Sequence, residues 1–189
     1  TTNNYGTAAA ADPWSTDNPD SSLTLAIGMQ LAGNTTGMNK GAINVVDGRS
    51  NGVSFGKGTA YGVEVSDNAT FTNIFDATIS LGRNANDLTQ DVDMAGGASP
   101  SAGILTRSSG DVTNAGTITL GTGVRNAAGI LVGNASGNVT NTGKIILNGD
   151  SSCGTSHNFG ISVRDSGSES NQQIRNDGEI TVNGHNNVG

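Results

Sequence analysis

Five imperfect copies of one strand-like pattern run along this chain, and they constrain its fold more than any other feature. The three cleanest copies are Val112-x-Asn114-x-Gly116-x-Ile118-x-Leu120, Val139-x-Asn141-x-Gly143-x-Ile145-x-Leu147 and Ile174-x-Asn176-x-Gly178-x-Ile180-x-Val182. The marked positions lie two residues apart, so all of their side chains point to one face of an extended chain. A short strand of the type Gly-Ile-x-Val precedes each copy, and these strands start at Gly28, Gly62, Gly103, Gly129 and Gly160.

The spacing of these glycines predicts the fold class. Successive glycines are 34, 41, 26 and 31 residues apart, and repeats of this length made of strands are typical of a β-solenoid. We predict an all-β chain in which residues 23–189 form a parallel β-helix of about five to six coils. Each Gly-Ile-x-Val strand is expected to bury two side chains. Residues 1–22 lack the pattern and are either a disordered lead-in or an N-terminal cap with Trp14 over the first coil, and we favour the cap.

Differences in repeat length are expected to fall in the turns. The longest repeat contains residues 83–101, which we predict to protrude as a loop. The second copy, Phe71-x-Asn73-x-Phe75-x-Ala77-x-Ile79-x-Leu81, is two residues longer than the others. An even insertion preserves the alternation of faces, so Phe75 and the other marked residues of this copy are expected to stay on the buried face.

One asparagine recurs at an inward position of every repeat, at Asn39, Asn73, Asn114, Asn141 and Asn176. A primary amide both donates and accepts hydrogen bonds, so stacked asparagines can satisfy one another. We predict a structural asparagine ladder. The motif glycine two residues later is expected at a corner where the backbone takes a positive φ or neighbouring coils approach closely.

Composition argues against several classes of partner. The net charge is −7, and the nine Lys and Arg residues are not clustered. Nucleic-acid binding requires a basic stripe that displaces counterions, so we expect no nucleic-acid partner. No apolar run approaches the roughly 18 residues of a membrane helix, so this segment is not expected to insert into a membrane. A signal peptide is not visible. Cys153 is the single cysteine, so stability is expected from the stacking of coils rather than from an internal disulfide.

No strong catalytic signature is present, and we expect no enzyme activity, no metal and no cofactor. His157 and His185 fall in turn-like segments, where two exposed histidines are a simpler interpretation than a metal pair. Nothing in the sequence orients Cys153 as a nucleophile.

The richest acidic stretch lies within residues 83–101. Its candidate binding residues are Arg83, Asn84, Asn86, Asp87, Asp91 and Asp93. Calcium-loop motifs are absent, and a solvated acidic loop is the simplest interpretation. Insertions in solenoids nevertheless often map to the binding face, so this loop is our candidate binding site. The glycine-rich segment 47–59, with Arg49, Asn51 and Lys57, is a second candidate.

The runs Asn114-Ala-Gly-Thr-Ile-Thr-Leu, Asn141-Thr-Gly-Lys-Ile-Ile-Leu and Asn176-Asp-Gly-Glu-Ile-Thr-Val, alternating with Gly-Ile-x-Val strands, resemble the passenger domains of bacterial type V autotransporters. The resemblance covers roughly residues 23–189. It implies a right-handed parallel β-helix that is exported through the outer membrane and displayed at the bacterial cell surface. It also implies a role in adhesion, and it brings no shared catalytic residues. We expect the chain to be an N-terminal fragment of such a passenger.

Three functions follow from these observations. The favoured one is a surface adhesin or self-association module that acts through lateral faces and loops, with a second copy on another cell, a host glycan or a matrix protein as partner. The first alternative is a polysaccharide-binding or polysaccharide-degrading β-helix, such as a lyase or tailspike, which would need clustered carboxylates and aromatic side chains on one face. The second alternative is a passive spacer.

Overall fold

A computed structural model describes residues 25–45, 59–82, 101–121, 124, 126–133, 137–148, 157–164, 172–184 and 187–189. Within these ranges the chain forms strands and turns without any helix, so no helix in them is long and apolar enough to cross a bilayer. The expected N-terminal cap with Trp14 lies outside the described residues. The same holds for residues 83–100 of the expected loop, whereas Ser101 is the first residue of a strand.

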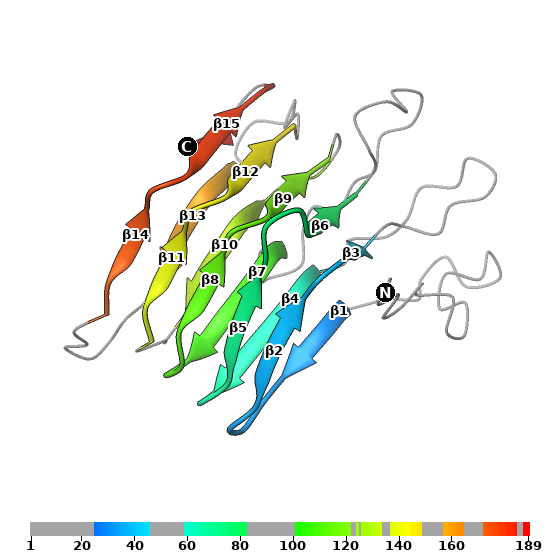
Figure 1. The fold of residues 1–189 in the computed structure, drawn as a ribbon. Helices are drawn as coiled ribbons and strands as arrows, with labels where there is room; N and C mark the ends of the chain where they lie inside the picture. Colours follow the sequence, from blue (N-terminus) through cyan, green and yellow to red (C-terminus); the bar gives the residue numbers. More distant parts are fainter. Residues whose placement is uncertain are drawn as a thin grey trace, which may run out of the picture.

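Each coil contributes one strand to each of three parallel sheets (Figure 1). Sheet A contains β1 (Leu25–Leu31), β4 (Thr59–Asp67), β7 (Ser101–Ser108), β10 (Ala127–Gly133), β13 (Asn158–Arg164) and β16 (Asn187–Val188). Sheet B contains β2 (Thr36–Asn39), β5 (Thr70–Asn73), β8 (Val112–Asn114), β11 (Val139–Asn141) and β14 (Ile174–Asn176). Sheet C contains β3 (Ala42–Val45), β6 (Thr78–Leu81), β9 (Thr117–Leu120), β12 (Lys144–Leu147) and β15 (Glu179–Val182).

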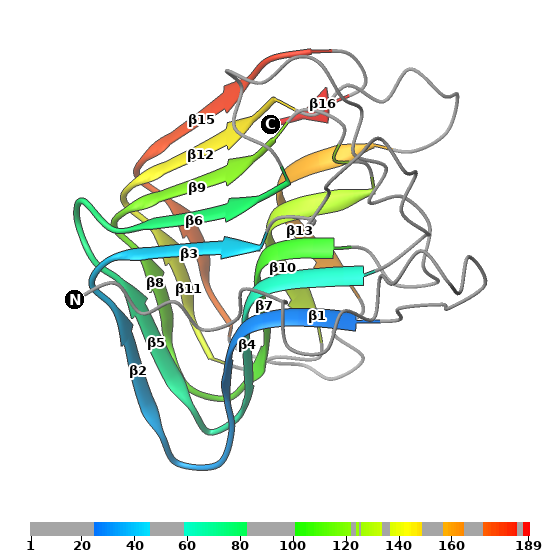
Figure 2. The same cartoon turned by 90° about the vertical axis from the view of Figure 1, so that its right-hand side faces the viewer.

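This arrangement is a right-handed parallel β-helix, which confirms the predicted fold class. Within the described residues, five coils each contribute a strand to all three sheets, and β16 pairs with β13 as the start of a sixth. The predicted motifs coincide with the coils: each Gly-Ile-x-Val motif lies in a sheet A strand, and each Asn-x-Gly motif joins sheet B to sheet C. Figure 2 shows the sheet C strands lying one above another, across the core from sheet A.

The main core is built from columns of like side chains, because residues with the same motif position pair in register from coil to coil. One column on sheet C consists of Ile43, Ile79, Ile118, Ile145 and Ile180. The first four of these are fully buried in one continuous cluster. Burying an aliphatic side chain of this size stabilises a fold by about 1.5–3 kcal/mol, so the repeated pattern supplies the driving force for stacking.

The glycine column of sheet A packs directly against this isoleucine column. A Cβ atom on Gly62 would lie 2.3 Å from Cγ2 of Ile79 and 2.5 Å from the carbonyl oxygen of Gly103. Only glycine leaves room for the isoleucine and for the next coil at once. The regular Gly-Ile-x-Val motif is therefore a packing requirement between two sheets.

The five motif asparagines form one column at the junction of sheets B and C. The side-chain Nδ2 of each donates to Oδ1 of the next, over 2.8 Å from Asn39 to Asn73, 2.7 Å to Asn114, 2.7 Å to Asn141 and 2.6 Å to Asn176. The first four are completely buried, whereas Asn176 in the fifth coil is exposed. Buried amides need partners because an unsatisfied one is strongly destabilising.

Candidate functional site

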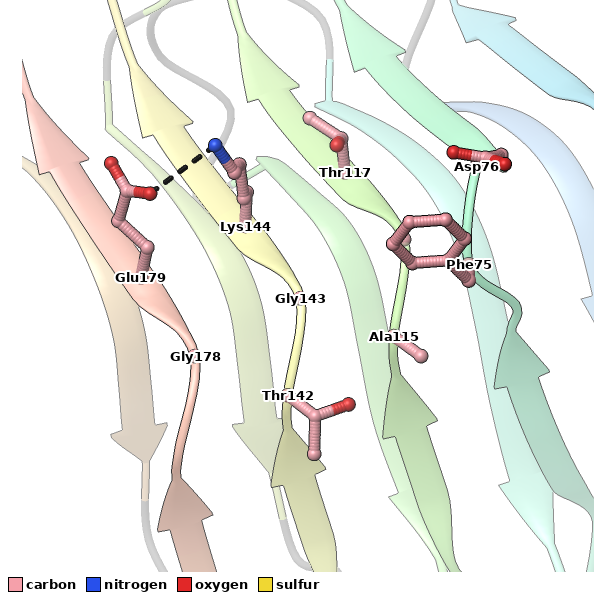
Figure 3. Close-up of a pocket in the computed structure, with 10 residues that line it drawn as sticks. Phe75, Asp76, Ala115, Thr117, Thr142, Gly143, Lys144, Gly178 and Glu179 are labelled. Atoms are coloured by element: carbon pink, nitrogen blue, oxygen red, sulfur yellow. Dashed lines mark ion pairs between the residues drawn. The ribbon is translucent and has the colours of Figure 1, made fainter.

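A groove of about 490 Å³ crosses the turns between sheets B and C (Figure 3). It spans four consecutive coils, from the second to the fifth. Its lining residues are Phe75, Asp76, Ala115, Gly116, Thr117, Thr142, Gly143, Lys144, Gly178 and Glu179. A volume of this size lies within the range of pockets that hold small ligands. It is therefore a candidate binding site on the solenoid surface.

The coil 2 end of the groove is formed by the two-residue insertion. Ala77 N donates to the carbonyl oxygen of Ile74 over 3.1 Å, which closes a turn, and Asp76 has a φ of 65°. This turn projects Phe75 into solvent, where 76% of it is exposed. The expectation that Phe75 stays on the buried face is therefore wrong. The insertion is absorbed by a local turn rather than by an extended strand.

The strand after the insertion keeps its register. Ile79 pairs with Ile118 and is fully buried, as the even insertion predicts. Phe75 is thus a large apolar side chain that the core does not use.

The floor of the groove consists of the motif turns of the third, fourth and fifth coils. A Cβ atom on Gly143 would lie 2.0 Å from the carbonyl oxygen of Gly116, and one on Gly178 would lie 2.1 Å from that of Gly143. None of these three glycines has a positive φ. Of the two reasons expected for glycine at this corner, close approach of neighbouring coils applies here. Because these glycines carry no side chain, nothing projects from them into the groove.

One wall of the groove is a column of sheet C side chains. Thr117, Lys144 and Glu179 occupy equivalent positions on β9, β12 and β15. Lys144 Nζ lies 3.3 Å from Oε2 of Glu179, with both side chains well exposed. The pKa of the Glu179 carboxyl is lowered, first because the Thr181 hydroxyl donates to it over 2.7 Å and then because of Lys144. This end of the groove therefore presents both a cation and an anion.

Backbone groups of the floor are already hydrogen-bonded to adjacent coils. Thr142 N and Gly143 N both donate to the carbonyl oxygen of Asn114, over 2.8 Å and 3.0 Å. Lys144 N donates to the carbonyl oxygen of Gly116 over 2.9 Å. A ligand in the groove must therefore be recognised mainly by side chains.

A second unusual feature lies on the other face of sheet A. Successive strand residues point to opposite faces, so Leu105 points away from the core residue Ile104, yet it is also buried. It belongs to a separate apolar cluster with Tyr61, Ala102, Ala128 and Leu131, against which Ile27 and Phe159 pack. Sheet A strands therefore bury side chains on both faces in the middle coils, more than the two per strand expected from sequence.

A polar group adjoins this second cluster. Glu64 accepts hydrogen bonds from Gln30 Nε2 over 3.1 Å and from Arg107 over 2.9 Å. Burial raises the pKa of Tyr61, and the positive charge of Arg107 partly opposes this rise. Glu64 thus accepts hydrogen bonds from side chains of the coils on both sides. We interpret this polar group as a structural link between three coils.

The sequence-predicted binding residues Arg83, Asn84, Asn86, Asp87, Asp91 and Asp93 all lie outside the described residues. The second candidate segment also lies outside them, except for its last residue, Thr59, the first of β4. Cys153 and His185 lie outside as well. His157 is described and makes an edge contact with Phe159, with ring centroids 6.4 Å apart. The described residues contain no group of three or more His, Cys, Asp or Glu that could hold a metal ion.

Sequence reasoning missed the groove. The signal that could have revealed it was the extra Phe75-Asp76 pair in one turn, because a turn longer than its neighbours must project from a stack of shorter ones. Comparison with known protein families, curated proteins and solved structures gives no match for this chain.

Proposed function

We propose that this chain is part of a bacterial autotransporter passenger, displayed at the cell surface, which acts as an adhesin by associating with copies of itself. The proposed contact is the outward face of sheet B. The observation that carries the proposal is a column of uncharged hydroxyl side chains on this face. The fold class and the resemblance of the repeats support the surface location and the export through the outer membrane.

The column lies on adjacent strands. Thr72, Thr113 and Thr140 pair in register on β5, β8 and β11 and are partly exposed. Parallel strands lie about 4.8 Å apart, so the three hydroxyls repeat at that interval along the coil axis. A hydroxyl both donates and accepts, so such a column can pair with a second copy of itself across a two-fold axis.

The small net charge of the described residues favours contact between two copies. The described residues hold six Asp and Glu side chains against five Lys and Arg side chains, so this part of the chain is close to neutral despite the net charge of −7. On sheet B, Arg175 is paired with Asp177 over 2.6 Å. Two such faces can approach without the strong repulsion expected from the whole chain.

Many weak contacts can give firm adhesion between cells. A single exchanged hydrogen bond contributes only about 0.5–1.5 kcal/mol. Repetition over coils, and over many copies on each cell, multiplies the effect because later contacts form at high effective concentration. Affinity between two isolated copies is therefore expected to be weak, and clustering of cells strong.

A mixed-population clustering assay tests the proposal. Two non-adherent bacterial strains of different colour display residues 1–189 on one strain or on both, with surface levels matched by an epitope tag. We expect mixed clusters only when both strains display the chain. The double variant Thr113→Lys/Thr140→Lys should abolish clustering, because two facing copies would then bring like charges together.

The matched control is Ser80→Lys/Thr119→Lys, which adds the same charge to adjacent coils on the outward side of sheet C. This variant should cluster like the unmodified chain. Dispersed cells in every mixture would refute self-association and favour the spacer hypothesis. Clusters that form when only one strain displays the chain would instead indicate a different receptor on the bacterial surface.

A further inference from the structure

We propose that the groove beside Phe75 binds a neutral oligosaccharide, with the phenyl ring stacking on the apolar face of a sugar ring. This proposal does not depend on self-association, because the groove lies at the turns between sheets B and C rather than on the threonine column. It concerns binding alone, without any cleavage of the sugar.

The first argument is the position of Phe75. It is the most exposed of the large hydrophobic side chains in the described residues, at 76%. With most of the ring in solvent, the fold gains little packing from it. A phenyl group held in solvent at the end of a groove offers a flat apolar surface, which suits the carbon face of a pyranose ring.

The second argument is the chemistry of the remaining lining. In Figure 3, Asp76 lies beside Phe75 at one end, and Lys144 and Glu179 lie at the other. Thr117 and Thr142 lie between them and carry hydroxyl groups. Carboxylates accept hydrogen bonds from sugar hydroxyls, and an ammonium group donates to them. These groups match a ligand rich in hydroxyls.

Charge decides between neutral and anionic sugars. Two carboxylates, Asp76 and Glu179, face the groove against a single ammonium group, Lys144. The ammonium is already paired with Glu179 over 3.3 Å. A sugar acid would bring further negative charge to this site, which like-charge repulsion disfavours.

A peptide strand fits the groove less well than a sugar. Peptides that bind to sheet edges depend on free backbone donors and acceptors. Here Thr142 N, Gly143 N and Lys144 N all donate to neighbouring coils. The floor therefore offers a peptide few main-chain partners, whereas a sugar can use the side chains of the wall.

The length of the groove indicates a chain of sugars rather than a single one. The groove runs from Asp76 in the second coil to Glu179 in the fifth, which is three coil steps. At about 4.8 Å per step, this distance is roughly 14 Å. A ligand of two or more sugar units can therefore contact Phe75 and the charged pair at once.

Titration of the purified chain with defined oligosaccharides tests the proposal. The probes are maltohexaose, cellohexaose and laminarihexaose, with hexagalacturonate as the anionic comparison and an unrelated peptide as the peptide comparison. Binding is followed by amide chemical shifts in NMR spectra. We expect at least one neutral hexasaccharide to bind and to shift the amides of Ala115, Thr142 and Gly143. Hexagalacturonate and the peptide should shift them less.

Variants then test the role of the ring. Phe75→Ala should weaken binding roughly two- to tenfold, the range expected for loss of one aromatic contact. Phe75→Trp should restore it. The matched control is Met38→Ala, which removes another exposed apolar side chain, 44% exposed, from sheet B. This control should bind like the unmodified chain.

Phe75→Ala should also unfold at an unchanged temperature, because the ring is solvent-exposed. Failure of all three neutral sugars to bind, or equal binding by Phe75→Ala, would overturn the proposal. Stronger binding of the peptide or of hexagalacturonate would overturn it as well. None of these outcomes bears on clustering of cells, so the two proposals fail or succeed separately.

Discussion

Replacing Asn114 by leucine probes the asparagine ladder at its centre. Asn114 Oδ1 accepts from Asn73 Nδ2, and Asn114 Nδ2 donates to Asn141 Oδ1, each over 2.7 Å. Leucine has nearly the same shape as asparagine but lacks donor and acceptor. The change therefore leaves one donor on Asn73 and one acceptor on Asn141 without that partner, in completely buried positions.

The expected loss of stability follows from these two groups. A buried polar group left unsatisfied destabilises a fold by about 1–3 kcal/mol, so Asn114→Leu should lower the free energy of unfolding by roughly 2–6 kcal/mol. Asn141→Leu should cost about half as much, because one of its two partners, Asn176, is exposed and can turn to water. The order of the two variants is thus set by burial alone.

Urea unfolding followed by circular dichroism measures the effect. The control is Asn34→Leu, because Asn34 accepts from Asn68 Nδ2 over 2.9 Å in an exposed pair of the same chemistry. It should change the free energy of unfolding by less than about 0.5 kcal/mol. If Asn114→Leu unfolds at the same urea concentration as this control, the ladder does not stabilise the coils and the reasoning is refuted.

Three further changes test other parts of the fold. Gly143→Ala should destabilise the chain by about 1–3 kcal/mol or more, because its Cβ would lie 2.0 Å from the backbone oxygen of Gly116. The control is Gly133→Ala, whose Cβ would have its nearest neighbour 3.9 Å away. This control should be nearly neutral in thermal unfolding. Because the pKa of Tyr61 is raised in the fold, its contribution is present below the ordinary value of about 10 and is lost as the pH rises through the folded value. The free energy of unfolding of the unmodified protein should therefore fall more steeply with rising alkaline pH than that of Tyr61→Phe. Urea unfolding at several alkaline pH values measures this, and an equal pH dependence in the two proteins would contradict it. Thr181→Val should raise the pKa of Glu179 toward its usual value, because it removes the largest cause of the shift, and a carboxyl titration by NMR that shows no change would argue against that hydrogen bond.

Much of the fold could be predicted because each coil must repeat the contacts of its neighbours. Asn114 pairs in register with Asn141, and Ile118 pairs with Ile145. The same residue types therefore recur at equivalent positions of successive coils. Alternation of side chains then identifies the inner face. Contacts between residues far apart in the chain can therefore be inferred from the repeated motif.

The second apolar cluster escaped prediction for a related reason. Leu105 and Leu131 occupy the variable position of the Gly-Ile-x-Val motif, where Glu64 stands in the second coil. The pattern alone therefore marked this position as outward and solvated. Continuous apolar runs, which are typical of parallel strands buried on both faces, were the available signal in the third and fourth coils.

The groove escaped prediction because it arises from a departure from the repeat. Asn73 and Phe75 are two residues apart and share the same parity, yet one is fully buried and the other is 76% exposed. Parity holds only while the backbone is extended, and the turn from Ile74 to Ala77 ends that condition. The hollow adjoins the one turn that carries an extra pair of residues, and Phe75 and Asp76 from that turn line it. In this solenoid, regular positions therefore account for stability, and the search for ligands should begin where the coils differ.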